Sequence, residues 1–282
     1  MKYRCWSRPE SCSDGTLVRA SSHAQTHHAT APIASVAPFP MRVAVISDIH
    51  SNLHALDAVL GEIDREEVAE IWCLGDVVGY GPRPNECCDL VRQRAARSLC
   101  GNHDLAVLGS LDVGEFAGDA GRAARWTAGE LGAEQRAWLV TLEPKARVDG
   151  AELYHGSPRD PVWEYVLSEQ VALASLQATE EPIVLVGHSH VALALAAEGG
   201  YVQGGLAPAG TVAELGTKRW LVNPGSVGQP RDGDPRAAWL LLDLDERMAT
   251  FRRIAYDVEQ TQAEIRARGL PDGLASRLSH GV

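Results

Sequence analysis

The chain has 282 residues, 45% of them hydrophobic, and a formal net charge of −11 at pH 7. This apolar content is enough for a sizeable core and excludes a wholly disordered chain. The acidic balance argues against a protein that grips nucleic acid through a basic surface, although the charge of any bound metal ion is missing from the count. No run approaches the roughly 20 apolar residues of a membrane span, so we expect no membrane partner.

The cysteines and the first residues indicate a cytoplasmic protein. Cys73 and Cys100 lie in apolar runs, and the adjacent Cys87 and Cys88 are poorly placed to pair with each other. This pattern favours reduced thiols over a disulfide framework. No apolar segment typical of a secretory signal follows the N-terminus.

Residues 1–40 are expected to be a disordered extension, and residues 41–282 a single domain. The first forty residues are rich in Ser, Ala, His, Thr and Pro and show no helix or strand period. An ordered pattern begins abruptly at Met41. We therefore hypothesise that Met41 is the biological start, which an intact mass including residues 1–40 in the natively expressed protein would refute.

Apolar strands alternate with amphipathic helices over the next sixty residues. The pattern predicts a strand, a helix, a strand, a helix and a strand in that order, over Arg42–Ser47, Leu53–Ile63, Ile71–Leu74, Pro84–Gln93 and Arg97–Cys100. This β-α-β-α-β order predicts a largely parallel sheet with helices on its faces.

The rest of the chain predicts one helical region, several strands and a closing helix. Residues 103–142 have a helical pattern, with Trp126, Leu131, Trp138 and Leu139 as expected core. A closing helix is expected over Asp257–Arg268, with Asp257 as its N-cap, and a short final helix over Leu274–Leu278. Strands are expected at Glu152–Tyr154, Ile183–Val186, Val191–Ala196, Arg219–Val222, Ala237–Leu244 and Met248–Ile254. The sum predicts a layered α/β-β/α sandwich, with two central mixed β-sheets flanked by helices.

Five of the apolar runs end in potential metal ligands. Ligands bind beyond the carboxyl ends of strands in open α/β folds, so these clusters are expected to meet at one site. The set mixes carboxylate, amide and imidazole without thiolate, which favours manganese or iron, with zinc or nickel as alternatives. The clusters are Asp48 with His50, Asp76, Asn102 with His103 and Asp104, His155, and His188 with His190.

Each cluster also has a simpler interpretation. An aspartate after a strand is commonly a turn residue or a helix cap, as Asp48 and Asp104 would be here. Five independent turns rarely all choose ligand residues, so the succession favours a metal site over this alternative.

The order D-x-H, GD, GNHD, H and GHSH resembles the calcineurin-like metallophosphoesterase superfamily over residues 41–254. The residues that flank these motifs are similar to those of the small bacterial and archaeal phosphodiesterase-like branch of the superfamily. The resemblance implies that Asp48, His50 and His190 bind one ion, that Asn102, His155 and His188 bind the other, and that Asp76 bridges them. It also implies that His103 protonates the leaving group or stabilises phosphoryl charge, oriented by Asp104 or Asp48.

The resemblance implies hydrolysis of a small-molecule phosphate ester by a hydroxide bridging two metal ions. Two ions about 3.5–4 Å apart lower the pKa of a shared water and neutralise phosphate oxygens. The phosphate-gripping arginines of the related protein phosphatases are absent from the GD and GNHD motifs, which favours a diester or small-molecule ester. The alternatives are a dinucleoside polyphosphate hydrolase, a phosphomonoesterase, a nuclease, or a metal-bound interaction scaffold that has lost catalysis.

Three further residues are candidates for substrate contact. Asn52 follows the D-x-H motif, Ser226 lies in an Asn-Pro-Gly-Ser turn, and Arg231 follows that turn. A helix cap for Asn52, a structural turn for Ser226 and a surface salt bridge for Arg231 are the alternatives. Trp163 and Tyr165 either line a substrate wall or pack in the core.

Overall fold

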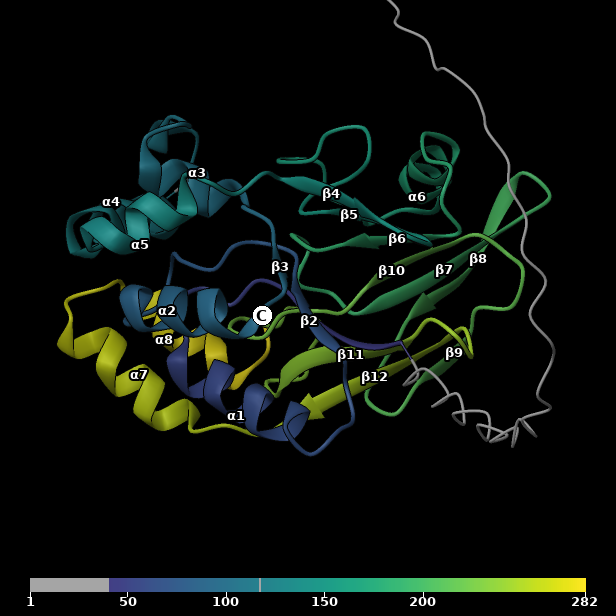
Figure 1. Cartoon of the computed structure of the whole chain (residues 1–282). Coiled ribbons are helices and arrows are strands. Elements are labelled where there is room, and N and C mark those ends of the chain that lie inside the picture. Colours follow the sequence, from purple (N-terminus) through teal and green to yellow (C-terminus); the bar gives the residue numbers. More distant parts are fainter. Residues whose placement is uncertain (1–40, 117) are drawn as a thin grey trace, which may run out of the picture. The chain divides into compact units, whose positions relative to one another are not determined.

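The computed structural model describes residues 41–116 and 118–282, and the extension expected over residues 1–40 lies outside them. Within the described residues, two six-stranded sheets pack face to face and carry helices on their outer faces (Figure 1). This confirms the predicted layered sandwich with two mixed sheets. No helix of the described part is long and apolar enough to cross a membrane.

Each sheet combines parallel and antiparallel strands. In the first sheet β1, β2 and β3 are parallel and the rest antiparallel, in the order β3 (Arg97–Ser98), β2 (Glu70–Cys73), β1 (Arg42–Ile46), β11 (Ala237–Asp243), β12 (Met248–Ile254) and β9 (Val212–Glu214). In the second sheet β5, β6 and β10 are parallel, in the order β4 (Lys145–Val148), β5 (Ala151–Tyr154), β6 (Ile183–Val186), β10 (Trp220–Asn223), β7 (Leu193–Glu198) and β8 (Tyr201–Leu206).

Side-chain alternation along β1 explains the layers. Val43 and Val45 lie in the core between the sheets together with Leu185 of the second sheet. Ala44 and Ile46 point to the opposite face, where they pack under helices. Successive strand residues face opposite ways, so a strand that is apolar throughout is buried on both faces.

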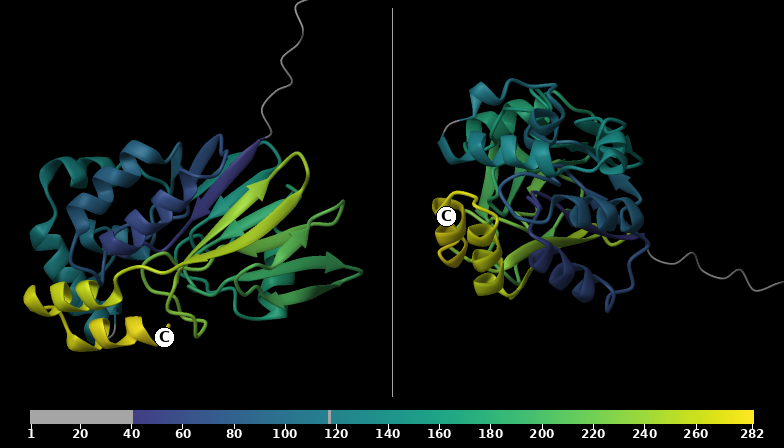
Figure 2. Two further views of the ribbon diagram at one scale, coloured as in Figure 1. Left: turned by 90° about the horizontal axis from the view of Figure 1, so that it is seen from below. Right: turned by 90° about the vertical axis from the view of Figure 1, so that its left-hand side faces the viewer.

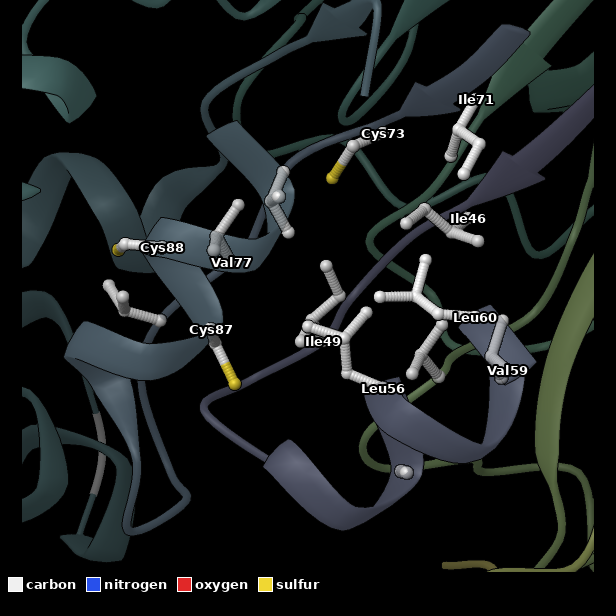
Figure 3. Close-up of a cluster of buried hydrophobic side chains, with 14 of the residues drawn as sticks. Ile46, Ile49, Leu56, Val59, Leu60, Ile71, Cys73, Val77, Cys87 and Cys88 are labelled. Carbon is white, nitrogen blue, oxygen red and sulfur yellow. The ribbon is translucent and has the colours of Figure 1, made fainter. Parts of the chain in front are cut away.

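The outer core of the first sheet lies beneath α1 (Leu53–Ile63) and α2 (Pro84–Arg94). Figure 3 shows Leu56 and Val59 of α1 gathered with Ile46 and with Cys87 of α2. The apolar spacing in α1 places one stripe of the helix on the sheet. Cys73, Cys87, Cys88 and Cys100 are buried and free; the apolar runs around Cys73 and Cys100 had predicted burial for these two.

The predicted helical region over residues 103–142 is divided into shorter pieces. Its elements are α3 (Asn102–Leu108), the 3-10 turn η1 (Val113–Glu115), α4 (Gly118–Glu130) and α5 (Ala133–Leu139). Gly109 has a left-handed φ of 81° and ends α3. Leu131 and Leu139 are buried as expected, whereas Trp126 and Trp138 are only partly buried.

Three strands and one helix of the structure were not predicted from the sequence. The strands β4, β8 and β9 lie at sheet edges, and half or more of β8 is exposed, so their apolar pattern is weak. The helix α6 (Glu169–Gln177) covers the outer face of the second sheet, and Ser168 caps it by accepting a hydrogen bond from the Val171 amide.

The C-terminal helices pack against α4 at the end of the sheets. α7 (Val258–Ala267) is capped by Asp257, which accepts a hydrogen bond from the Gln260 amide at 2.8 Å as predicted. α8 (Asp272–Ser276) and the turn η2 (Arg277–Ser279) follow. Leu274 and Leu278 form a buried cluster with Tyr80. Figure 2 shows these helices, in yellow, beside the blue and teal helices that follow the first strands.

An ion pair between Arg83 and Glu264 ties α7 to the start of α2. Nε and Nη2 of Arg83 donate to the two carboxylate oxygens of Glu264 at 2.7 and 3.0 Å. These hydrogen bonds lower the pKa of Glu264 to about 2. A carboxyl whose pKa falls on folding stabilises the native state above its unfolded pKa of about 4.3, and loses this effect as the pH falls through the folded pKa.

We expect Glu264→Gln to lower the free energy of unfolding by about 1–3 kcal/mol at pH 7 and by less near pH 3. Urea denaturation at both pH values measures the difference. Glu259→Gln, at an exposed position of the same helix, is the matched control. An equal loss at the two pH values would show that the carboxylate charge is not the cause.

Candidate metal centre

The predicted ligands come together where strands of both sheets end. Asp48 and His50 follow β1, Asp76 follows β2, and Asn102 begins α3 after β3. His155 follows β5 of the second sheet, and the pair His188 and His190 follows β6. All seven are buried, with exposed fractions of 3% or less.

Five of these residues have left-handed backbone. The φ angles of Asp48, His50, Asp76, His188 and His190 lie between 50° and 62°. Non-glycine residues adopt this region at an energetic cost, and such strain is concentrated at functional sites. All five of these conformations occur within four residues of the ends of β1, β2 and β6.

The side chains form two groups of potential metal ligands that share Asp76. Asp48, His50, Asp76 and His190 form one group, and Asp76 also belongs to the second group with His155 and His188. Oδ2 of Asp76 lies 3.5 Å from Nε2 of His50 and 3.5 Å from Nε2 of His155. One carboxylate oxygen thus faces both groups.

Backbone carbonyls determine which ring nitrogen of each histidine is available. Nδ1 of His50, of His155 and of His190 donates to the carbonyls of Val78, Leu74 and Gln229 at 3.2, 3.0 and 2.6 Å. The opposite nitrogen, Nε2, therefore carries the free lone pair in these three rings.

His188 is held the other way round. Its Nε2 lies 3.2 Å from the Trp163 carbonyl, to which it donates, so Nδ1 is the free nitrogen. The backbone amide of His188 donates to Oδ2 of Asp48 at 3.1 Å. That contact joins the two ligand groups through the loop after β6.

The free lone pairs of the ligand atoms face one another, and a cation bound between them would remove their mutual repulsion. Nε2 of His50 and Nε2 of His190 are 3.0 Å apart, although both rings already donate through Nδ1. Nε2 of His155 lies 3.1 Å from Oδ1 of Asn102, also an acceptor. Oδ1 of Asp48 is buried without a hydrogen-bond partner in the described residues. These acceptors repel unless positive charge lies between them, so the donor set fits divalent metal ions.

The pKa values of the ligand side chains show the cost of burying charged groups when no cation is bound among them. Burial raises the pKa of Asp48 to about 7 and that of Asp76 well above its usual range. Burial lowers the pKa of His155 to about 3 and that of His188 to about 2. Neutral imidazole is the metal-binding form, and ionised carboxylate is the form that bound cations would favour.

His103 lies beside the ligands. Its ring makes an edge contact with His50, with centroids 4.9 Å apart, and its Nδ1 has no hydrogen-bond partner among the described residues. Gly79 provides the space: a Cβ there would lie 2.7 Å from that nitrogen. The backbone amide of His103 donates to Oδ1 of Asp76 at 2.9 Å, which fixes the bridging candidate.

Asp104 has a different partner set from the one expected. Its carboxylate accepts hydrogen bonds from the amides of Gly101, Val77 and Val78 at 2.9, 3.2 and 3.0 Å. In the described residues neither Asp104 nor Asp48 hydrogen-bonds the ring of His103. Asp104 thus caps α3 and holds the turn after Asp76, and it acts on His103 only through the backbone.

The side chains of Asn52 and Ser226 form hydrogen bonds with backbone groups of the protein. Asn52 caps α1 through the Ala55 amide at 3.2 Å and donates to the Gly228 carbonyl at 2.9 Å. The Ser226 hydroxyl donates to the Asp48 carbonyl and accepts from the Gln229 amide, both at 2.8 Å. Both side chains are buried, and their contacts agree with the alternatives of a helix cap for Asn52 and a structural turn for Ser226; substrate contact by either residue stays a prediction.

Arg231 is near the ligands and is not in a salt bridge. No carboxylate among the described residues lies within ion-pair distance of it. Its Nη2 donates to the Gln229 side chain at 2.9 Å and to the Tyr80 hydroxyl at 3.3 Å. Burial is the largest cause of the lowered pKa values of His103 and His190, and the positive charge of Arg231 lowers them further. The backbone amide of Arg231 donates to the His190 carbonyl at 3.1 Å, which places the residue beside the centre.

Tyr80 is a residue of the site that the sequence reasoning missed. It is buried, has a left-handed φ of 52°, and its ring packs 4.5 Å from His50 and 4.4 Å from His103. It also holds Arg231, whose guanidinium carbon lies 5.9 Å from the ring centroid. A bulky residue between two glycines, four positions after Asp76 of the Gly-Asp motif, was the available signal.

Comparison with known proteins agrees with this geometry. The sequence profile of the calcineurin-like phosphoesterase superfamily domain matches residues 41–247. An uncharacterized protein of Methanocaldococcus jannaschii, MJ0912, is 36% identical over 244 residues, covering 85% of this chain and 98% of that protein. The chain therefore belongs to the calcineurin-like metallophosphoesterase superfamily.

Solved structures show the same fold. The crystal structure of a metallophosphoesterase from Sphaerobacter thermophilus is 42% identical with a TM-score of 0.78, covering 86% of this chain and all of that chain. A hypothetical protein of Pyrococcus horikoshii, PH1004, is 21% identical with a TM-score of 0.69, covering 86% of this chain and 98% of that chain. Family, fold and clustered Asp and His ligands agree on the metal-dependent phosphoesterase class.

Proposed function

We propose that this protein is a dinuclear metal-dependent phosphodiesterase acting on a small-molecule substrate. The two ligand groups that share Asp76 carry the proposal. Asp48, His50 and His190 would hold one divalent ion, manganese or iron in first place. The second ion would be held by Asn102, His155 and His188, with Asp76 common to both. The buried, free cysteines support a reducing cytoplasm as the compartment.

When bound, two such ions neutralise phosphoryl oxygens and lower the pKa of the water that attacks phosphorus. The chain's own residues then supply the rest. Burial lowers the pKa of His103 to about 3, so the ring is neutral in the absence of ligand, and its centroid lies 4.9 Å from that of His50. A neutral imidazole would donate a hydrogen bond to the leaving oxygen; it would transfer a proton only as imidazolium, a form that the negative charge of a bound phosphate favours.

The arginine content of the motifs supports a diester over a monoester. A phosphodiester carries one negative charge, whereas a monoester carries nearly two at neutral pH. The Arg231 guanidinium donates to Tyr80 and Gln229 beside the centre, and the arginines that grip a phosphate in the related protein phosphatases are absent from the motifs. The charge of two bound divalent ions would add to that of Arg231, so the preference for a diester rests on those absent arginines and not on a balance of charges.

The proposal is tested with the full chain and Mn²⁺ on bis(4-nitrophenyl) phosphate and on 4-nitrophenyl phosphate. We expect EDTA to abolish turnover and the diester to give the higher kcat/KM. A preference for the monoester would assign a phosphomonoesterase. Two bound ions without turnover on either compound would favour the scaffold alternative.

We expect Arg231→Lys to lower kcat/KM for the diester about 10- to 100-fold, mainly through KM. A charged hydrogen bond contributes about 1.5–3 kcal/mol, and lysine lacks the planar fork that Tyr80 and Gln229 position. Steady-state kinetics measure the change. Arg236→Lys is the control, since Arg236 lies on the same loop and pairs with Asp234. Unchanged kcat/KM in Arg231→Lys would remove Arg231 from the site.

A further inference from the structure

Three aromatic side chains stand beside the metal centre. The Phe116 ring makes an edge contact with His103, with centroids 4.8 Å apart, and lies 5.3 Å from the Trp163 ring. The Tyr165 ring stacks on His188 at 3.9 Å with an interplanar angle of 12°. We call Phe116, Trp163 and Tyr165 the aromatic wall.

The aromatic wall is not part of the hydrophobic core. Phe116 and Trp163 are only partly buried, and Tyr165 is 44% exposed. None of the three belongs to the buried core clusters formed by residues 41–116 and 118–282. The alternative that Trp163 and Tyr165 are core residues is therefore not supported, and aromatic rings that stay partly exposed side by side indicate a binding surface.

The aromatic wall contacts both a proposed metal ligand, His188, and the proposed proton donor, His103. Tyr165 covers one face of His188, and the Trp163 carbonyl accepts the hydrogen bond that orients the same ring. Phe116 contacts His103 on the other side. A group bonded to a phosphoryl centre held between His188 and His103 would lie next to these rings.

The rings are not parallel to one another. The planes of Phe116 and Trp163 meet at 53°, so the pair forms an open angle and not a closed stack. A flat ring can use such a surface through stacked or edge contacts, whereas a flexible alkyl group gains only the hydrophobic contact. The three rings are uncharged, so they would contact the organic group of the ester. The charged phosphate group would be recognised by Arg231 and the metal ions.

We propose that the aromatic wall binds a planar aromatic group of the substrate, which makes the substrate an aryl or nucleobase-bearing phosphate ester. This inference rests on the proposed phosphoesterase function for the position of the phosphate. It assigns Phe116, Trp163 and Tyr165 as specificity-determining residues, with the phosphoryl group recognised separately by the metal centre and Arg231.

Equilibrium binding to the manganese-loaded full chain tests the inference without relying on turnover. Phenylphosphonate and cyclohexylphosphonate carry the same anion and rings of similar size, but only the first ring is flat and aromatic. Calorimetry should give a Kd for phenylphosphonate about 5- to 150-fold lower, the range expected for stacking on aromatic side chains. Equal Kd values for the two compounds would overturn the proposal.

Substitutions locate the effect. Trp163→Leu and Tyr165→Leu should each reduce the ratio of the two Kd values toward one. Tyr201→Leu is the matched control, since Tyr201 is an aromatic residue 51% exposed on β8, at the hairpin end of β7 and β8 away from the ligands. A ratio that falls equally in the control would also overturn the proposal.

A second pair of ligands separates the two sources of the aromatic group. Adenosine 5′-monophosphate and ribose 5-phosphate differ only by the base, so a lower Kd for the nucleotide identifies a nucleobase site. Preference for phenylphosphonate without preference for the nucleotide identifies an aryl site. If the wild-type protein binds the aromatic ligand more tightly but does not hydrolyse the diester, the proposed function is refuted and this inference stands. If it hydrolyses the diester but binds both ligands equally, only this inference is refuted.

Discussion

Asp76→Asn is expected to reduce the metal content of the whole centre and to remove nearly all turnover. Asp76 is the residue that both ligand groups share, and its Oδ2 lies at equal distances from His50 and His155. Asparagine has the same shape and can still accept the hydrogen bond from the His103 amide. If Asp76 bridges two ions as proposed, the variant removes a negative charge from between two cations and leaves the turn intact.

Elemental analysis after equilibration with Mn²⁺ measures this effect. We expect two ions per wild-type chain and fewer than one in Asp76→Asn, with turnover reduced in the same samples. Asp89→Asn is the control, because Asp89 is an exposed carboxylate on α2 that pairs with Arg92. Full metal content and activity in Asp76→Asn would show that Asp76 does not bridge two ions.

His103→Ala is expected to separate metal binding from turnover. The ring of His103 packs against the ligands but belongs to neither ligand group. Its removal should leave metal content unchanged and lower kcat by about 10²–10⁴-fold, the usual contribution of a general acid or base. Metal analysis and steady-state kinetics on the same preparation test both parts.

The control for this variant is His54→Ala. His54 lies on α1, where its Nε2 is 3.3 Å from Glu264. It should keep the kcat of the wild type. If His103→Ala lost ions as well as turnover, His103 would be a ligand; if it kept full turnover, the proton donor would have to be another group.

The central strands were predictable because burial on both faces makes them apolar throughout. β6 has the predicted bounds, β1 ends one residue earlier than predicted, and β2 begins and ends one residue earlier than predicted. Edge strands such as β8 have no such pattern, since a strand with one neighbour and glycine at positions 204 and 205 buries little. The helical region was predicted in one piece because periodicity does not reveal where Gly109 adopts a left-handed turn.

The ligand residues were predictable for a related reason. They follow strands, and in parallel strands the carboxyl ends meet at one edge whatever the distance along the chain. The partners of Arg231 and Tyr80 were not, because 151 positions separate them and only the folded chain brings them together. The cap by Asn52 and the turn at Ser226 were among the expected alternatives, but their bonds to the carbonyls of Gly228 and Asp48 join positions 176 and 178 apart and could not be read from the sequence.

The division of the ligands between the sheets has a consequence for the whole molecule. Each ligand group combines residues that follow the first sheet with residues that follow the second. An ion bound by such a group would cross-link the two layers, which are otherwise joined by the apolar core between the sheets and by hydrogen bonds such as that of His155 to the Leu74 carbonyl. Ions that bind the folded chain alone shift the folding equilibrium toward it. A chelator therefore acts on the cohesion of the sandwich as well as on the reaction at its edge.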